Sequence, residues 1–429
     1  MHPSARWTSF EGWDYNGMKE RLETALAGLN KDVLLSHAEL IKGQKLSISE
    51  NFSAGQFWVC LEMVAEDGSL VIARVRLPRH PNTLPTVSEE DEFYAISCEV
   101  STMHFVGRKN LPSVVVPKVY AYEGPGSRRA AAVGAIYMLL EGFYGNTLQD
   151  VAFDLCNLPV ASRDHIMAQW TMAQAQLATL AYPQIGSITT ITKSGEPIIG
   201  KLSIAAAEGL VPQRPFSTAT EYFTAIGKAT LRRAELQDDE RNRDSARFSR
   251  LSAFVFLDIV QTTGLFGASQ DLFPLSHMDL GMQNIIVDDD SNFLGLLDWE
   301  FAQTAPWQVN HYPMPFPLIW PDRKIKNALD DPTHVAHRNM LKQHSARRLY
   351  CQKFREAEII LTGEGLLEGT FAEVLESPAS KIYACFSKLG DIPEQDIDHV
   401  REMVRLAFGV DDEGTDRYLR NMQSRISSS

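Results

Sequence analysis

Four polar side chains with the chemistry for phosphoryl transfer stand in residues 275–300, LSHMDLGMQNIIVDDDSNFLGLLDWE. They are His277, Asp279, Asn284 and Asp298. Mg²⁺ prefers oxygen ligands and often takes only one or two from the protein, so Asn284 and Asp298 are candidate metal ligands. Asp279 is then the candidate base that accepts a proton from the attacking group. The spacing HxDxxxxN is typical of a phosphoryl-transfer catalytic loop.

Two short apolar runs around this loop predict a β-hairpin. Residues 285–287 and 293–297 are apolar, and the acidic turn 288–292 separates them. A loop, a strand, a turn and a strand form a hairpin. Because the loop and the exit of the second strand lie on the same side, the three oxygen-bearing side chains are expected at one end of it.

The block HMDLGMQNIIVDDDSNFLGLLDWEFA resembles aminoglycoside phosphotransferase-like enzymes, and most closely their fungal branch. The resemblance covers about residues 50–325 and implies a two-lobed, protein-kinase-like α+β fold. It implies a β-rich small nucleotide-binding lobe at 46–141 and a mainly helical catalytic and substrate lobe at 142–429, behind an N-terminal helical extension at 1–45. ATP and Mg²⁺ are the implied cofactors, and His277 is expected to brace the catalytic loop by hydrogen bonds.

The strand VIARVRLP stands where such folds carry the lysine that positions the phosphates. Here Arg74 is the better match, and Arg76 lies on the same strand face. Arginine keeps the charge and changes the geometry. Glu99, within the helical segment EFYAISCEVSTMHFV, is the expected ion-pair partner of Arg74. For Arg76, an ordinary exposed strand position is the alternative.

Two further segments are expected to contact the nucleotide. The turn NFSAGQF resembles the phosphate-covering turn, in which small residues allow a close approach of the backbone to an anion. Ser53 and Gly55 are the residues predicted there. The strand YMLLEG resembles the connector to the large lobe, so that Met138, Leu140 and Glu141 are predicted around the adenine.

Substrate choice is expected to lie in the helices of residues 219–263, which wall the acceptor pocket in the resembling family. Glu300 could steady the turn after Asp298 or meet a cationic acceptor. The aromatic, proline-rich stretch 307–320, beginning at Trp307, is a second candidate surface for a small acceptor, with ordinary packing as the alternative. A protein substrate is disfavoured because the APE element of protein kinases is missing here.

The composition excludes several other classes of protein. The 429 residues carry a formal charge of −13, which opposes sequence-independent binding to nucleic acid or to anionic membranes. No window of about 18 apolar residues predicts a membrane span. The start of the chain lacks the pattern of a secretory signal, and five scattered cysteines indicate reduced thiols of a cytoplasmic protein. We therefore expect a small-molecule kinase. The alternative is a nucleotide-binding protein that has lost transfer activity.

Overall fold

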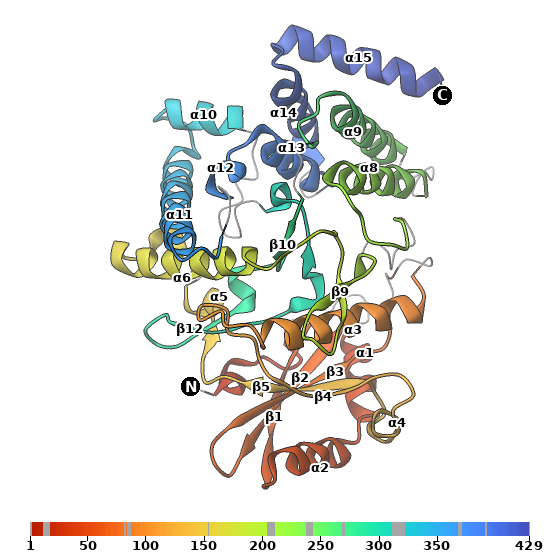
Figure 1. The fold of residues 1–429 in the computed structure, drawn as a ribbon, viewed down its shortest axis with the longest axis vertical. Helices are drawn as coiled ribbons and strands as arrows, with labels where there is room; N and C mark the ends of the chain where they lie inside the picture. Colours follow the sequence, from red (N-terminus) through yellow and green to blue (C-terminus); the bar gives the residue numbers. More distant parts are fainter. Residues whose placement is uncertain are drawn as a thin grey trace.

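A computed structural model of the chain has two lobes, a β-rich small lobe and a mainly helical large lobe (Figure 1). The predicted α+β class and its division into two lobes are confirmed. The limits predicted for the domains stay a prediction. The structure describes residues 2–11, 18–80, 83, 87–152, 154–203, 211–236, 243–267, 271–310, 322–367, 371–390 and 393–428.

The small lobe is built on a five-stranded antiparallel sheet. Its strands are β1 (Leu46–Ala54), β2 (Trp58–Ala65), β3 (Leu70–Arg76), β4 (Val119–Glu123) and β5 (Tyr137–Gly142). Their order in the sheet is β1-β2-β3-β5-β4. The hairpin predicted from the AEDGS turn is confirmed, since β2 and β3 pair from Trp58 opposite Arg76 to Val64 opposite Leu70. Gly68 in this turn has φ +78°, which glycine adopts without steric penalty.

The outer face of the sheet is apolar and is covered by two N-terminal helices. These helices are α1 (Met18–Ala27) and α2 (Lys31–Lys42). Leu22 of α1 and Leu34 of α2 are buried in the same core as Leu61 and Ala73 of the central strands. The second helix ends at Gly43, whose φ of +69° suits a C-terminal cap. The two helices therefore share a core with the sheet that follows them.

The inner face of the sheet packs on α3 (Glu89–Val106), which lies between the sheet and the large lobe (Figure 1). Ser88 and Asp91 form a capping box that fixes the start of this helix. Ile96 of α3 and Met138 of β5 are buried in a core that extends into the large lobe. The inner face therefore joins the two lobes.

Helices make up most of the large lobe, while the small lobe has one further short helix, α4 (Arg128–Val133). The large-lobe helices are α5 (Leu148–Val151), α6 (Val160–Ala178), α8 (Ala219–Leu236), α9 (Arg243–Thr262), α10 (Asp322–Asp330), α11 (His337–Gly363), α12 (Phe371–Leu375), α13 (Pro378–Ser387), α14 (Asp396–Phe408) and α15 (Asp412–Ser428). The helices predicted for residues 163–180, for 219–263 and beyond residue 331 are present. Within the described residues, no helix is both long and apolar enough to span a membrane.

Short strands flank the loop of residues 277–284 in the large lobe. β11 (Ile285–Val287) pairs with β12 (Phe293–Leu296), which confirms the predicted hairpin, and β11 also pairs with β6 (Asn146–Thr147). The loop follows β10 (Phe273–Ser276), a strand that the sequence analysis did not predict. This strand pairs with β7 (Ala181–Tyr182) on one side and with β13 (Gln303–Thr304) on the other. The remaining short strands, β8 (Ile188–Ile191) and β9 (Pro197–Ile199), pair with each other.

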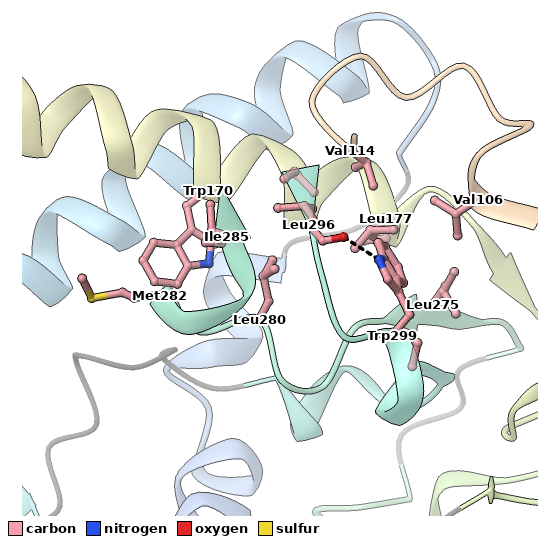
Figure 2. Close-up of a cluster of buried hydrophobic side chains, with 14 of the residues drawn as sticks. Val106, Val114, Trp170, Leu177, Leu275, Leu280, Met282, Ile285, Leu296 and Trp299 are labelled. Atoms are coloured by element: carbon pink, nitrogen blue, oxygen red, sulfur yellow. Dashed lines mark hydrogen bonds between the residues drawn. The ribbon is translucent and has the colours of Figure 1, made fainter. Parts of the chain in front are cut away.

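An apolar cluster below the hairpin fixes its position. Figure 2 shows Ile285 and Leu296 of the hairpin beside Trp170 and Leu177 of α6, and all four are buried in one core. Trp299 lies in the same core, where its Nε1 donates to the carbonyl oxygen of Leu296 at 2.8 Å. The polar loop before β11 is therefore anchored in a packed core, to which its own residues Leu280 and Met282 also contribute.

Candidate active site

A row of side chains crosses the inner face of the sheet. The strand register places Ser53 opposite Cys60, Cys60 opposite Arg74, and Arg74 opposite Met138. Directly paired residues of neighbouring strands point to the same side of a sheet. Three residues predicted separately as nucleotide contacts, Ser53, Arg74 and Met138, therefore share one face.

Arg74 is the charged centre of this face. Its Nη1 pairs with Oε1 of Glu99, and its Nη2 donates to Oδ1 of Asp298 at 3.0 Å. The guanidinium carbon lies 4.6 Å from the ring centroid of Trp58, a favourable cation–π contact. Burial raises the pKa of Glu99, and the charge of Arg74 partly offsets this effect. The structure thus contains the Arg74–Glu99 pair and adds Asp298 as a second partner.

The order of elements around this pair is that of protein-kinase-like folds. Three strands are followed by the helix that carries Glu99, and then by two more strands that complete the sheet. In such folds the basic residue of the third strand pairs with a glutamate of this helix. Arg74 and Glu99 occupy these two positions.

Asp279 and Asn284 are in direct contact in the loop before β11. The Nδ2 of Asn284 donates to the backbone oxygen of Asp279 at 2.8 Å and to its Oδ2 at 3.0 Å. Gln283 donates to the other carboxylate oxygen of Asp279 at 3.2 Å. Burial raises the pKa of Asp279, and the negative charge of Asp298 raises it further. Asp279 is therefore a stronger base than an exposed aspartate.

His277 joins the loop to the end of β12. Its side chain is 3% exposed, and its Nε2 donates to the carbonyl oxygen of Leu297 at 2.9 Å. The imidazole ring lies 4.6 Å from the ring centroid of Trp299. Burial lowers the pKa of His277 to about 4, so that the ring is neutral at pH 7. This neutral, buried histidine therefore joins the loop to the end of the hairpin by a hydrogen bond.

Two residues of the site have an unusual backbone conformation. Met278 has φ +66° and Asp298 has φ +61°, in the left-handed region that residues with side chains rarely adopt. The N–H of Leu297 donates to the carbonyl oxygen of Asn284 at 2.7 Å, which joins the loop to the residue before Asp298. This backbone geometry brings Asp298 within reach of both lobes, since its carboxylate bonds Arg74.

Glu300 adds a fourth acidic group to the same neighbourhood. Burial and the negative charges of Asp298 and Glu99 raise the pKa of Glu300 to about 8, against the opposing effect of Arg74 and Arg76. Glu300 therefore holds its proton near pH 7. A cationic acceptor that used Glu300 would have to displace this proton.

The strand β5 carries the residues that were predicted around the adenine. Met138, Leu140 and Glu141 lie in a strand whose backbone pairs with β3 on one side and with β4 on the other. The N–H of Glu141 donates to the carbonyl oxygen of Lys118 at 2.8 Å. This N–H is therefore engaged in the sheet, and the contacts predicted between these three residues and an adenine stay a prediction. The side chains of Met138 and Leu140 remain on the inner face.

The turn after β1 is open, whereas Trp307 is packed away. Gly55 is exposed, and a Cβ added there would meet no atom within 4 Å. Trp307 is 9% exposed, and its ring lies 4.2 Å from that of Phe371, within the large-lobe core. The structure does not bring Trp307 to the other candidate residues. Residues 311–320 of the predicted acceptor stretch lie outside the described residues.

Two contacts within a single lobe were missed by the sequence analysis, the stacking of Trp58 on Arg74 and the bond from Gln283 to Asp279, in addition to the bond between the lobes from Arg74 to Asp298. The first could have been found. Counting outward from the AEDGS turn pairs Trp58 with Arg76 and Cys60 with Arg74, which places an indole beside both arginines. The second had no signal, because a glutamine in a polar loop has many partners to choose from.

Comparison with known proteins adds remote similarities. No family model matches the chain. The clavilactone A biosynthesis cluster protein Y of Ampulloclitocybe clavipes is 24% identical over 301 residues, which cover 70% of this chain and 69% of that protein. A Thermobifida fusca YX-ER1 protein named as a fructosamine-3-kinase is similar in structure, with a TM-score of 0.43 and 14% identity over 87% of this chain and 98% of its own. For a macrolide 2'-phosphotransferase type I the TM-score is 0.40, with 12% identity over 87% and 96%.

Proposed function

We propose that the protein is an ATP- and Mg²⁺-dependent phosphotransferase that acts on a hydroxyl group of a small molecule, such as an amino alcohol, a sugar or a secondary metabolite. One observation carries the proposal. Asp279, Asn284 and Asp298 converge at the end of the β11–β12 hairpin, and Arg74 reaches Asp298 from the opposite lobe. Base, metal ligands and phosphate-binding cation are the parts that this reaction needs.

The donor set fits a hard divalent cation. Asn284 uses its Nδ2 to bind Asp279, which leaves its amide oxygen as the atom available to a metal. Asp298 offers a carboxylate that is 32% exposed, of which one oxygen bonds Arg74. One amide oxygen and one carboxylate, completed by phosphate oxygens and water, form a typical Mg²⁺ site. When bound, the ion would neutralise charge on the phosphates.

The inner face of the small lobe would hold the nucleotide. Arg74, fixed by Glu99 and by the Trp58 ring, would position the phosphates with a permanently charged group. Ser53 and Gly55 would lie over the phosphates, since the open space at Gly55 allows a close approach of the backbone. The apolar side chains of Met138 and Leu140 would contact the adenine.

Asp279 would act on the acceptor. Its carboxylate is held by Asn284 and Gln283, so that it keeps one orientation. It would orient the acceptor hydroxyl and accept its proton while the phosphoryl group moves in line. His277 would position this loop through Leu297 and would not touch the acceptor.

The proposal is tested first by ligand binding. ATP with Mg²⁺ should raise the melting temperature, and Asp298→Ala should abolish the part of this shift that depends on the metal. Asp290→Asn, an exposed aspartate in the turn of the same hairpin, is the matched control and should keep the full shift. An unchanged metal-dependent shift in Asp298→Ala would reject the assigned role.

A second candidate is a nucleotide-binding protein without transfer activity, and the arginine at position 74 favours it. Both candidates predict the thermal shift with ATP and Mg²⁺. Only the enzyme should transfer label from γ-phosphate-labelled ATP to one member of a panel of amino alcohols and sugars. Transfer that is present in the unmodified protein and lost in Asp279→Asn would reject the second candidate.

A further inference from the structure

A cavity of about 950 Å³ lies in the large lobe, apart from the proposed active site. Residues of α6, α10, α11, α12, α13 and α14 line it, and none of them belongs to the loop of residues 277–284 or to the inner face of the sheet. Pockets for small molecules typically enclose roughly 300–1,000 Å³. This cavity therefore has room for a ligand of its own.

The lining of this cavity is cationic in a protein that is strongly acidic. Seven arginine or lysine residues line it against three aspartate or glutamate residues, a formal charge of +4 with the histidines neutral. The whole chain has a formal charge of −13. Like charges gathered around one cavity repel each other, so the cluster would be stabilised by an anion bound among them.

The three acidic residues of the lining are already counted in this formal charge of +4, and each of them is paired with a basic residue other than Arg348 and Arg355. The pairs are Asp330 with Lys326 at 2.7 Å, Glu376 with Lys381 at 3.5 Å, and Glu402 with Arg405 at 3.1 Å. Arg348 and Arg355 of α11 line the cavity, and their spacing of seven residues places them on one face of the helix. Arg163 adds a buried Nε that has no hydrogen-bond partner.

Apolar side chains form the other part of the lining. They include Leu349 of α11, Leu375 of α12, Leu406 of α14 and the buried Ile325 of α10. Ala384 of α13, a small residue, also lines the cavity. An inorganic anion would gain nothing from the apolar surfaces, and a neutral apolar molecule would offer no counter-charge to Arg348 and Arg355.

We propose that this cavity binds an amphipathic organic anion, with a phosphate or carboxylate group between Arg348 and Arg355 and an apolar body on the leucine side chains. Arginine is suited to this role because its planar group binds phosphate or carboxylate with two hydrogen bonds. The apolar body would add the free energy of removing its surface from water. The inference is independent of the proposed phosphoryl transfer, since the two sites share no residue.

The first test compares three probes by isothermal titration calorimetry with the full chain. Octyl phosphate, kept below its micelle concentration, should bind saturably at one site, with a Kd at least tenfold lower than that of inorganic phosphate or of octanol. Equal affinity for inorganic phosphate would indicate a simple anion site, and equal affinity for octanol a simple apolar one. Either result, or no saturable binding of octyl phosphate, would overturn the proposal.

Variants then locate the site. Arg348→Glu combined with Arg355→Glu should weaken octyl phosphate binding at least tenfold. Arg338→Glu is the matched control, since this exposed arginine lies on the same helix outside the cavity, and it should bind as the unmodified protein does. Ala384→Trp keeps every charge, fills the space, and should also block binding. Octyl phosphate binding that survives both the double variant and Ala384→Trp, but is lost in Asp298→Ala, would place the probe at the other site and refute the proposal.

Discussion

The two faces of the small-lobe sheet differ in what their side chains do. Toward α1 and α2, the sheet presents Leu61, Ala73 and their neighbours, all buried and apolar. On the opposite face, Arg74 contacts an indole ring and two carboxylates. The register alternates these sets residue by residue, since Ala73 and Arg74 are adjacent in one strand.

The outer face of the sheet contributes mainly to the stability of the fold, and the inner face carries the residues of the candidate site. Apolar burial on the outer face stabilises the fold without directing any functional atom. On the inner face, Glu99 is buried beside other acidic groups, so its charge is tolerated only because Arg74 is present. We therefore expect substitutions on the outer face to change the free energy of unfolding, and substitutions at the inner site to change catalysis or its pH dependence.

The largest effect is expected at the base. Asp279→Asn keeps the size of the side chain and removes its ability to accept a proton, so kcat should fall by about 10²-fold or more. The thermal shift with ATP and Mg²⁺ should remain. Steady-state kinetics and melting curves measure the two quantities. A loss of nucleotide binding equal to the loss of rate would contradict the division between base and metal ligands.

Leu61→Ala tests the outer face. Leu61 is fully buried, and its truncation should lower the free energy of unfolding by about 3 kcal/mol, because apolar contacts are lost and a cavity remains. Below the melting temperature, kcat per folded molecule should be unchanged. Chemical denaturation and an active-site titration provide the measurements. A tenfold fall in kcat with little loss of stability would mean that the two faces are not separate in function.

Glu300 gives the inner site a pH-dependent stability. Its pKa is raised from the usual 4.5 to about 8. Between about pH 4.5 and pH 8 the carboxyl group is therefore protonated in the folded state and ionised in the unfolded state. Stability from this group is present at low pH and is lost as the pH rises through this range. Glu300→Gln, which mimics the protonated form, should therefore be more stable than the unmodified protein at pH 9, by up to about 5 kcal/mol, and within about 1 kcal/mol of it at pH 5.

Melting curves at the two pH values check this prediction, with the exposed Glu23→Gln of α1 as the control. The control variant should change the melting temperature by the same small amount at both pH values. If Glu300→Gln were less stable than the unmodified protein at pH 9, the carboxylate would be charged and well paired in the fold.

The smallest effect is expected at Gly55. An added Cβ meets no atom there, and the backbone does not require glycine, so Gly55→Ala should leave the melting temperature unchanged. If the backbone of this turn approaches the phosphates, the methyl group should raise the KM for ATP by about threefold. Gly68→Ala, in the other turn of the sheet, is strained by its φ of +78° and should show the reverse pattern. An unchanged KM in Gly55→Ala would separate this turn from the nucleotide.

The parts of the fold that the sequence predicted well are local ones. The β11–β12 hairpin, the AEDGS turn and the helices have periodicities and turn residues that can be recognised in short windows. Asp279 and Asn284 are five residues apart, so their meeting needed no knowledge of the whole fold. The pairing of Arg74 with Glu99 came from the resemblance to a known family, and their roles in binding stay predictions.

Contacts between distant parts of the chain were not predicted. Arg74 and Asp298 are 224 residues apart, and only the packing of the two lobes decides that they meet. Burial and Asp298, two residues away, raise the pKa of Glu300 first, and only the further rise caused by Glu99 comes from the other lobe. The basic cavity is lined by residues between Val160 and Leu406, and none of them shows in the sequence alone that it lines a cavity. Backbone pairing across β5 likewise depends on β4, whose approach engages the N–H of Glu141 with the carbonyl oxygen of Lys118.

The left-handed backbone at Met278 and Asp298 has a consequence for attempts to make the protein more robust. A residue with a side chain in that region stores conformational energy, about 1 kcal/mol or more, which the surrounding core must hold in place. Glycine at position 278 would release this energy, and the loop would then sample orientations in which Asp279 no longer faces its amide partners. Substitutions meant to raise the melting temperature should therefore be made first in α1 and α2, and the loop at Met278 should be left unchanged.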